Sequence, residues 1–70
     1  MEPRGQFAVN LRRLREDAEL TQDGLSDLSG LHSTEISRLE RGVRDPRLST
    51  IVRLARALRV EPAQLLADMR

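Results

Sequence analysis

The chain has 70 residues, of which 33% are charged and 39% hydrophobic, with a net charge of +1 and no cysteine. This length fits one small domain, and the lack of cysteine excludes a disulfide framework and a cysteine-based metal site. The apolar runs are far shorter than the roughly 20 residues of a membrane span, and the N-terminus MEPRGQF has no apolar core behind its charge, so we expect a soluble, cytoplasmic protein without a signal peptide or a membrane partner.

Hydrophobic residues recur at helical spacing from the start of the chain. A first helix is predicted over about residues 5–18, with one apolar face made by Phe7, Leu11, Leu14 and Ala18. Thr21 is a good N-cap for a second helix, in which Leu25 and Leu28 are expected to face inward. Gly30 can adopt the left-handed conformation that ends this helix.

The second half of the chain has the same periodicity. A third helix is predicted over about 33–41, burying Ile36 and Leu39 and stopping at Gly42. After a turn at Pro46, a fourth helix over about 48–58 presents Leu48, Ile51, Val52, Ala55 and Leu58. Glu61-Pro62 opens a fifth helix to about residue 69. Five short helices with short loops predict one all-α domain, residues 1–70.

Charge is distributed unevenly along the chain. Residues 1–15 carry +3, residues 16–30 carry −5, residues 31–59 carry +4 and residues 60–70 carry −1. All twelve basic residues are arginine, which fits either codon usage in a GC-rich genome or, for a few of them, bidentate contacts to phosphate or guanine. The chain is therefore polarised, with its basic residues on both sides of an acidic segment.

A short helix, a turn at glycine and a second short helix have the spacing of a helix-turn-helix. The surrounding residues make this signal specific: Leu20-Thr21-Gln22, Gly30-Leu31, Ile36-Ser37-Arg38-Leu39-Glu40-Arg41-Gly42 and Leu54-Ala55-Arg56-Ala57-Leu58. Over about residues 11–60 the chain resembles the Cro/repressor-type (xenobiotic-response-element-like) helix-turn-helix family. The resemblance implies a five-helix, lambda-repressor-like fold in which helices 2 and 3 bind DNA, with helix 5 at about residues 62–69.

The resemblance also implies roles for individual residues. Ser33, Thr34, Ser37 and Arg38 match the face of the third helix that reads base edges in the major groove. Gln22, at the start of the second helix, matches a phosphate-binding position, and a helix N-terminus attracts anions. The further residues expected to contact phosphate are His32, Arg41, Arg44 and Arg47. The alternatives are structural: a solvated arginine face, a helix-start Gln22 and a small, exposed Ser37.

Arg15 and Glu40 match positions that form a partly buried ion pair in the family, so a structural role is expected for both. Glu35 does not suit a helix that enters a DNA groove, because its carboxylate repels phosphate. It could tilt away, pair with a neighbouring arginine or accept a hydrogen bond from cytosine N4.

Several positions depart from the family pattern. Ser26 replaces the usual alanine, and its hydroxyl could bond to the preceding turn. Gly24 weakens the first turn of the second helix by up to about 1 kcal/mol relative to alanine. His32 stands at the N-cap of the third helix, where it suits a cap or a phosphate contact better than a metal site. Arg59 replaces a glycine that often ends helix 4, so that helix is expected to end without a left-handed residue.

The sequence therefore predicts a regulator that binds double-stranded DNA sequence-specifically, as a homodimer on a pseudo-palindromic operator. The candidates for the dimer surface are Leu65, Leu66 and Met69, which could instead close the core. The alternative function is a protein-interaction module, such as an antitoxin-like partner or an adaptor, docking through the acidic run of residues 16–27. No catalytic constellation surrounds the one histidine, so neither an enzyme nor a cofactor or metal is expected.

Overall fold

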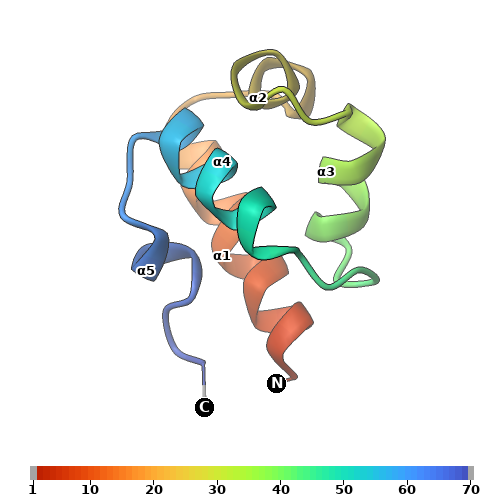
Figure 1. Cartoon of the computed structure of the whole chain (residues 1–70), viewed down its shortest axis with the longest axis vertical. Helices are drawn as coiled ribbons and strands as arrows, with labels where there is room; N and C mark the ends of the chain where they lie inside the picture. The colour runs from red at the N-terminus through yellow and green to blue at the C-terminus, as the bar shows by residue number, and fades with distance from the viewer. Residues whose placement is uncertain (1, 70) are drawn as a thin grey trace.

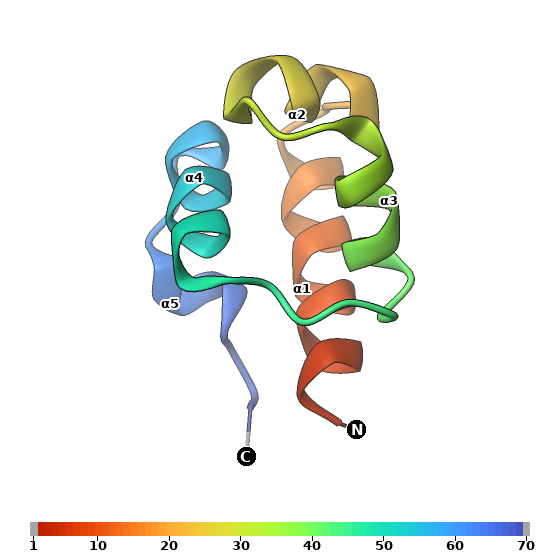
Figure 2. The same ribbon diagram turned by 45° about the vertical axis from the view of Figure 1, so that its right-hand side comes forward.

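The computed structural model of the chain describes residues 2–69 and contains five helices in that range. They are α1 (Pro3–Asp17), α2 (Gln22–Ser29), α3 (Ser33–Glu40), α4 (Leu48–Leu58) and α5 (Pro62–Leu65). Residues 2–69 form no strand. Helix α1 packs against α3 and α5, α4 packs against α2 and α5, and α2 crosses the C-terminal end of α1 (Figures 1 and 2). This arrangement confirms the predicted five-helix, all-α fold.

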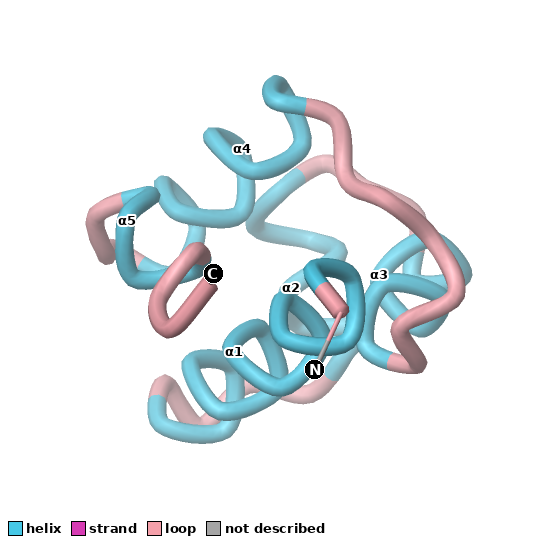
Figure 3. Tube along the Cα trace, turned by 90° about the horizontal axis from the view of Figure 1, so that it is seen from below, coloured by secondary structure: helices cyan, strands magenta, loops and turns pink. Residues whose placement is uncertain are grey.

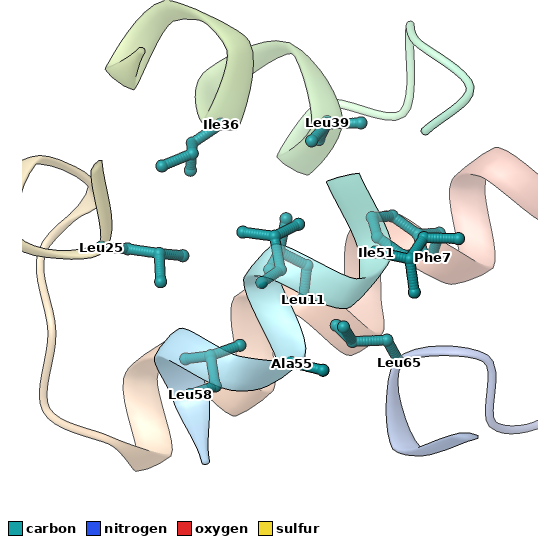
Figure 4. Packing of buried hydrophobic residues seen from close by; sticks show 10 residues of the cluster. Phe7, Leu11, Leu25, Ile36, Leu39, Ile51, Ala55, Leu58 and Leu65 are labelled. Atoms are coloured by element: carbon teal, nitrogen blue, oxygen red, sulfur yellow. The ribbon is translucent and has the colours of Figure 1, made fainter. Parts of the chain in front are cut away.

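Buried apolar side chains from all five helices meet in one core (Figure 4). Its members are Phe7, Leu11, Leu25, Ile36, Leu39, Ile51, Leu54, Ala55, Leu58 and Leu65. The short helices α2 and α3 each bring only one or two of these large side chains. They are therefore held in place mainly by packing on α1 and α4 rather than by their own helical propensity.

Three predicted core residues lie at the surface instead. Leu28 is 61% exposed and Leu48 is 77% exposed, while Ala18 is also exposed. Leu48 is the first residue of α4, before the helix reaches the core. Leu28 and Ala18 lie where α2 and α1 end, beyond the edge of the core.

The helix boundaries differ from the predictions at the two ends of the chain. Helix α1 begins at Pro3 rather than near residue 5, because proline at the first helical position is preorganised for a helix. Helix α5 ends at Leu65 rather than near residue 69. The Asn10 side-chain amide donates to the carbonyl oxygens of Leu65 and Ala67, both at 2.9 Å, and so takes the Leu65 acceptor that a further helical turn would use.

Helices α2 and α4 both end at a residue in the left-handed conformation. Helix α2 ends at Gly30 with φ +79°, as predicted. Helix α4 ends at Arg59 with φ +57°, so the expectation of no left-handed residue there was wrong. Arg59 adopts this conformation because it lets the Val60 N–H donate to the Ala55 carbonyl at 3.0 Å, which closes the end of the helix.

Within the described range, no helix combines the length and the apolar character needed to cross a bilayer.

Candidate DNA interface

The N-terminus of α2 presents backbone donors next to Gln22. Thr21 caps the helix by accepting a hydrogen bond from the Gly24 N–H at 2.9 Å, as its sequence position predicts. The first N–H groups of a helix have no partner within the helix. Because Thr21 satisfies only the donor of Gly24, the N–H groups of Gln22 and Asp23 are available to an anion at the positive end of the helix dipole.

The turn between α2 and α3 is fixed by two side-chain hydroxyls. The Ser26 hydroxyl donates to the Leu31 carbonyl, and the Leu31 N–H donates to the Ser29 hydroxyl at 3.2 Å. The expected bond to the preceding turn was therefore wrong: the Ser26 hydroxyl contacts the turn that follows its own helix, where the Leu31 carbonyl lies within its reach. With Gly30 in the left-handed conformation, these bonds set the angle at which α3 leaves α2.

Helix α3 has one buried face and one exposed face. Ile36 and Leu39 are completely buried on the core side. At 100° per residue, the opposite face carries Thr34, Ser37, Arg38 and Arg41. Thr34, Arg38 and Arg41 are exposed there and Ser37 is half-buried, while the half-buried Ser33 flanks this face. The structure thus places the predicted base-reading residues on or beside one accessible surface.

His32 and Arg47 occupy the N-cap positions of α3 and α4 and are both exposed. Neither side chain makes a capping hydrogen bond. Arg41 directly follows α3 and is also exposed. The loop of residues 41–47 then leads from α3 across to α4 (Figure 3). His32 and Arg41 thus remain accessible at the two ends of α3, and Arg47 is accessible at the start of α4.

Glu35 pairs with a neighbouring arginine, which is one of the three arrangements considered from the sequence. Its Oε1 accepts a hydrogen bond from Arg44 Nη1 at 3.2 Å. The carboxylate is therefore partly neutralised at the flank of α3. Arg44 joins the loop to α3 and is not a free cation in this structure.

Arg15 and Glu40 form the ion pair that the resemblance implied. Arg15 Nε and Nη2 donate to the two Glu40 oxygens at 2.6 and 3.0 Å, and Arg15 Nη1 donates to the Leu20 carbonyl at 2.7 Å. The Glu40 side chain is fully buried and that of Arg15 is 12% exposed. This bidentate pair fastens the end of α3 to α1 and to the start of the turn before α2.

Two further donors reach the same carboxylate. Gln22 Nε2 donates to Glu40 Oε1 at 3.1 Å, and Arg12 Nε lies 3.5 Å from that oxygen. Burial alone would raise the pKa of Glu40, but the hydrogen bonds from Arg15 and Gln22 outweigh it and hold the pKa below its ordinary value of 4.5. The bond to Glu40 raises the pKa of Arg15.

The roles of Arg12 and Asn10 were not predicted from the sequence. The only available signal for Arg12 is its i, i+3 spacing to Arg15, which places both on the side of α1 that faces α3. Asn10 is fully buried and bonds to carbonyls 55 and 57 residues away in the sequence. No local pattern reports such a distant partner.

Leu65, Leu66 and Met69 occupy three different environments. Leu65 is 0% exposed and belongs to the core, and Met69 is partly buried against it. Leu66 is 41% exposed. Of the three dimer candidates, Leu66 therefore presents the largest accessible apolar surface, whereas Leu65 closes the core as its alternative assignment stated.

Comparison with known proteins identifies the family. A sequence model of the helix-turn-helix domain matches residues 6–68. The chain is 42% identical over 60 residues to the control protein C.SmaI of Serratia marcescens, covering 86% of this chain and 71% of that protein. It is 44% identical over 55 residues to the HTH-type transcriptional repressor RghR of Bacillus subtilis, covering 77% of this chain but only 41% of that protein.

A solved structure agrees with these matches. The crystal structure of the restriction-modification controller protein C.AhdI from Aeromonas hydrophila aligns with a TM-score of 0.86 at 40% identity, over 89% of this chain and 94% of that one. The similarity thus extends to both sequence and three-dimensional arrangement. The chain belongs to the helix-turn-helix domain family, in agreement with its Cro/repressor-type sequence pattern.

Proposed function

We propose that this protein is a transcriptional regulator that binds double-stranded DNA by placing α3 in the major groove, with the N-terminus of α2 on the phosphate backbone. One observation carries the proposal. Both acidic residues of α3 are engaged by arginines, Glu35 by Arg44 and Glu40 by Arg15. The exposed face of α3 is left with hydroxyls and the positive charges of Arg38 and Arg41.

Each part of this surface has a chemical role in the proposal. Arg38 donates to guanine O6 and N7, while Ser33, Thr34 and Ser37 contact base edges with little selectivity of their own. Arg41 and Arg47 bind phosphates beside the groove, and His32 and the α2 N-terminus bind them on the other side. Arg44 either keeps its ion pair with Glu35 or gives it up to bind a phosphate.

The proposal includes a homodimer. One recognition helix makes too few base contacts to select a site in a genome, so two copies on an inverted repeat are needed. Leu66 is the apolar residue we place at the dimer contact. Acting on DNA inside a prokaryotic cell, the regulator belongs in the cytoplasm. The relatives' names include both a repressor and a control protein.

Selection of bound duplexes from a randomised DNA pool tests this function. The selection uses nonspecific competitor at near-physiological salt, because salt sets the strength of phosphate binding. We expect enrichment of an inverted repeat with half-sites about 10 bp apart. The selection is repeated in parallel with the Arg38→Ala variant. An Arg13→Ala variant serves as the control, because Arg13 is exposed on α1 and lies away from the side of that helix that faces α3. No enrichment, together with no retention of DNA at low salt, would instead favour the interaction-module function.

A further inference from the structure

A hollow of about 620 Å³ opens where α2 and α4 both end, beside the turn that follows α1. Its apolar lining comes from Ala18, Leu20, Leu28, Ala57 and Leu58. Leu28 is the most exposed large apolar side chain of α2, and it was expected in the core. Leu28 therefore lines the hollow rather than the core, and most of its side-chain surface is exposed to water.

Three arginines, Arg53, Arg56 and Arg59, also line the hollow. None of them has an acidic partner within 4.0 Å among residues 2–69, and the lining includes no acidic residue. The C-terminal ends of α2 and α4 each contribute about half a negative charge here. They offset about one of the three positive charges, so the residues that line the hollow keep a net positive charge.

The hollow lies away from the recognition surface. The lining comes from α2, α4 and the residues that follow α1 and α4, and no residue of α3 contributes to it. The arginines without an acidic partner within 4.0 Å among residues 2–69 include two sets in different places. Arg38 and Arg41 lie on or directly after α3, whereas Arg53, Arg56 and Arg59 line the hollow. A molecule bound in the hollow would leave the exposed face of α3 free.

We propose that this hollow is a docking site for an acidic peptide segment of a partner protein, which inserts one large apolar side chain against Leu28. An apolar lining with unpaired arginines at its edge is complementary to that chemistry. The open shape suits a side chain presented by a peptide better than an enclosed small molecule. The proposal rests on the hollow alone and does not depend on DNA binding by α3.

Titration of the ¹⁵N-labelled whole chain with a synthetic peptide tests the proposal. The probe is a twelve-residue peptide with five glutamates and a central leucine. We expect saturable amide shifts confined to Ala18, Leu28, Ala57 and their neighbours. Changing the peptide's leucine to serine, or its glutamates to glutamines, should weaken binding by about tenfold each, because the apolar and the ionic contacts are both required.

Two protein variants locate the contact. Arg53→Glu/Arg56→Glu should weaken peptide binding by at least about tenfold, whereas Arg13→Glu, a matched surface change on α1, should leave it within about twofold. Circular dichroism melts check that both variants fold, and Arg53→Gln/Arg56→Gln replaces the first if it does not. Shifts that do not saturate, or that spread equally to Arg38 and Arg41, would show general charge attraction and overturn the proposal.

DNA is the competing occupant, and a separate measurement distinguishes it. Affinity for a duplex retained at low salt is compared for Arg53→Gln/Arg56→Gln and Arg41→Ala. We expect the hollow variant to bind DNA within about twofold of the parent chain. A loss as large as that of Arg41→Ala would make the hollow part of the DNA footprint and would overturn the peptide proposal while leaving DNA binding intact.

Discussion

The side-chain amide of Gln22 donates to Oε1 of Glu40 at 3.1 Å, which connects the start of α2 to the buried ion pair behind α3. The amide nitrogen has a second N–H, which remains for a phosphate oxygen. The same carboxylate is held by Arg15 through two hydrogen bonds. The position of the proposed phosphate contact and the stability of the fold thus depend on one buried acid.

Replacing Glu40 should destabilise the fold strongly. Glu40→Ala leaves the nearly buried Arg15 without its partner, and we expect a loss of about 3–5 kcal/mol in the free energy of unfolding. Urea denaturation measures it. Asp45→Ala is the control, because Asp45 is exposed and lies 3.8 Å from Arg4; it should change stability by less than about 1 kcal/mol.

The double variant Arg15→Met/Glu40→Leu shows how much of the loss of stability comes from the unpaired charge and how much from lost side-chain packing. Replacing both ions with apolar side chains removes the unpaired charge, so the double variant should be more stable than Glu40→Ala. If Glu40→Ala lost less than 1 kcal/mol, the ion pair would not fasten α3 to α1.

Glu40 should also make stability depend on pH. Because its pKa in the folded chain lies below the ordinary value of 4.5, its contribution is fully present above about pH 4.5 and is lost as the pH falls through the folded-state pKa. We expect the unfolding free energy of the parent chain to fall more steeply below pH 4.5 than that of Glu40→Gln. Parallel urea titrations at several pH values check this, and equal slopes would contradict it.

The local pattern of the sequence predicted the helices well because short-range signals determine them. Thr21 caps α2, Gly30 ends it, and α4 has the predicted bounds. The same patterns misplaced Leu28 and Leu48, since periodicity cannot show where a short helix leaves the core. The burial of a residue at a helix end depends on which neighbour covers it, and that information lies elsewhere in the chain.

For the candidate site, the sequence predicted which face of α3 is exposed better than it predicted which side chains bond to each other. The exposed face of α3 follows from helical geometry and the burial of Ile36 and Leu39. The pairing of Glu35 with Arg44 required the path of the loop of residues 41–47. The bond from Gln22 to Glu40 required the angle between α2 and α3. Neither of these two features has a local signal.

Arg59 offers a stabilising substitution. Its φ of +57° lies in the left-handed region, which costs a residue with a side chain roughly 1–2 kcal/mol. Arg59→Gly removes that cost but gives the unfolded chain more freedom, so we expect a net gain of about 0.5–1 kcal/mol. Arg56→Gly, within α4, should instead lose about 1 kcal/mol. Thermal melts of the two variants decide it, and a loss at both positions would contradict the prediction.

Arg38 and Arg41 should affect DNA binding differently. If Arg38 reads guanine, Arg38→Ala should cost about 1–3 kcal/mol on the selected duplex and relax preference at one base pair of each half-site. Arg41→Ala should weaken all duplexes to a similar extent and reduce the slope of log affinity against log salt by about 1. Binding assays at four salt concentrations separate the two, and a matching loss of sequence preference in both variants would refute the assignment.

Leu66 should contribute to the contact between the two copies of the proposed dimer. Leu66→Asp places a charge on the exposed apolar surface beside α5. We expect the dissociation constant of the dimer to rise at least about tenfold, since a buried leucine contributes about 1.5–3 kcal/mol. Sedimentation equilibrium measures the constant for both chains. Val9→Asp is the matched control, because Val9 is 48% exposed but lies on α1. A parent chain that stays monomeric on the selected inverted repeat, or a dimer that only Val9→Asp disrupts, would place the contact elsewhere.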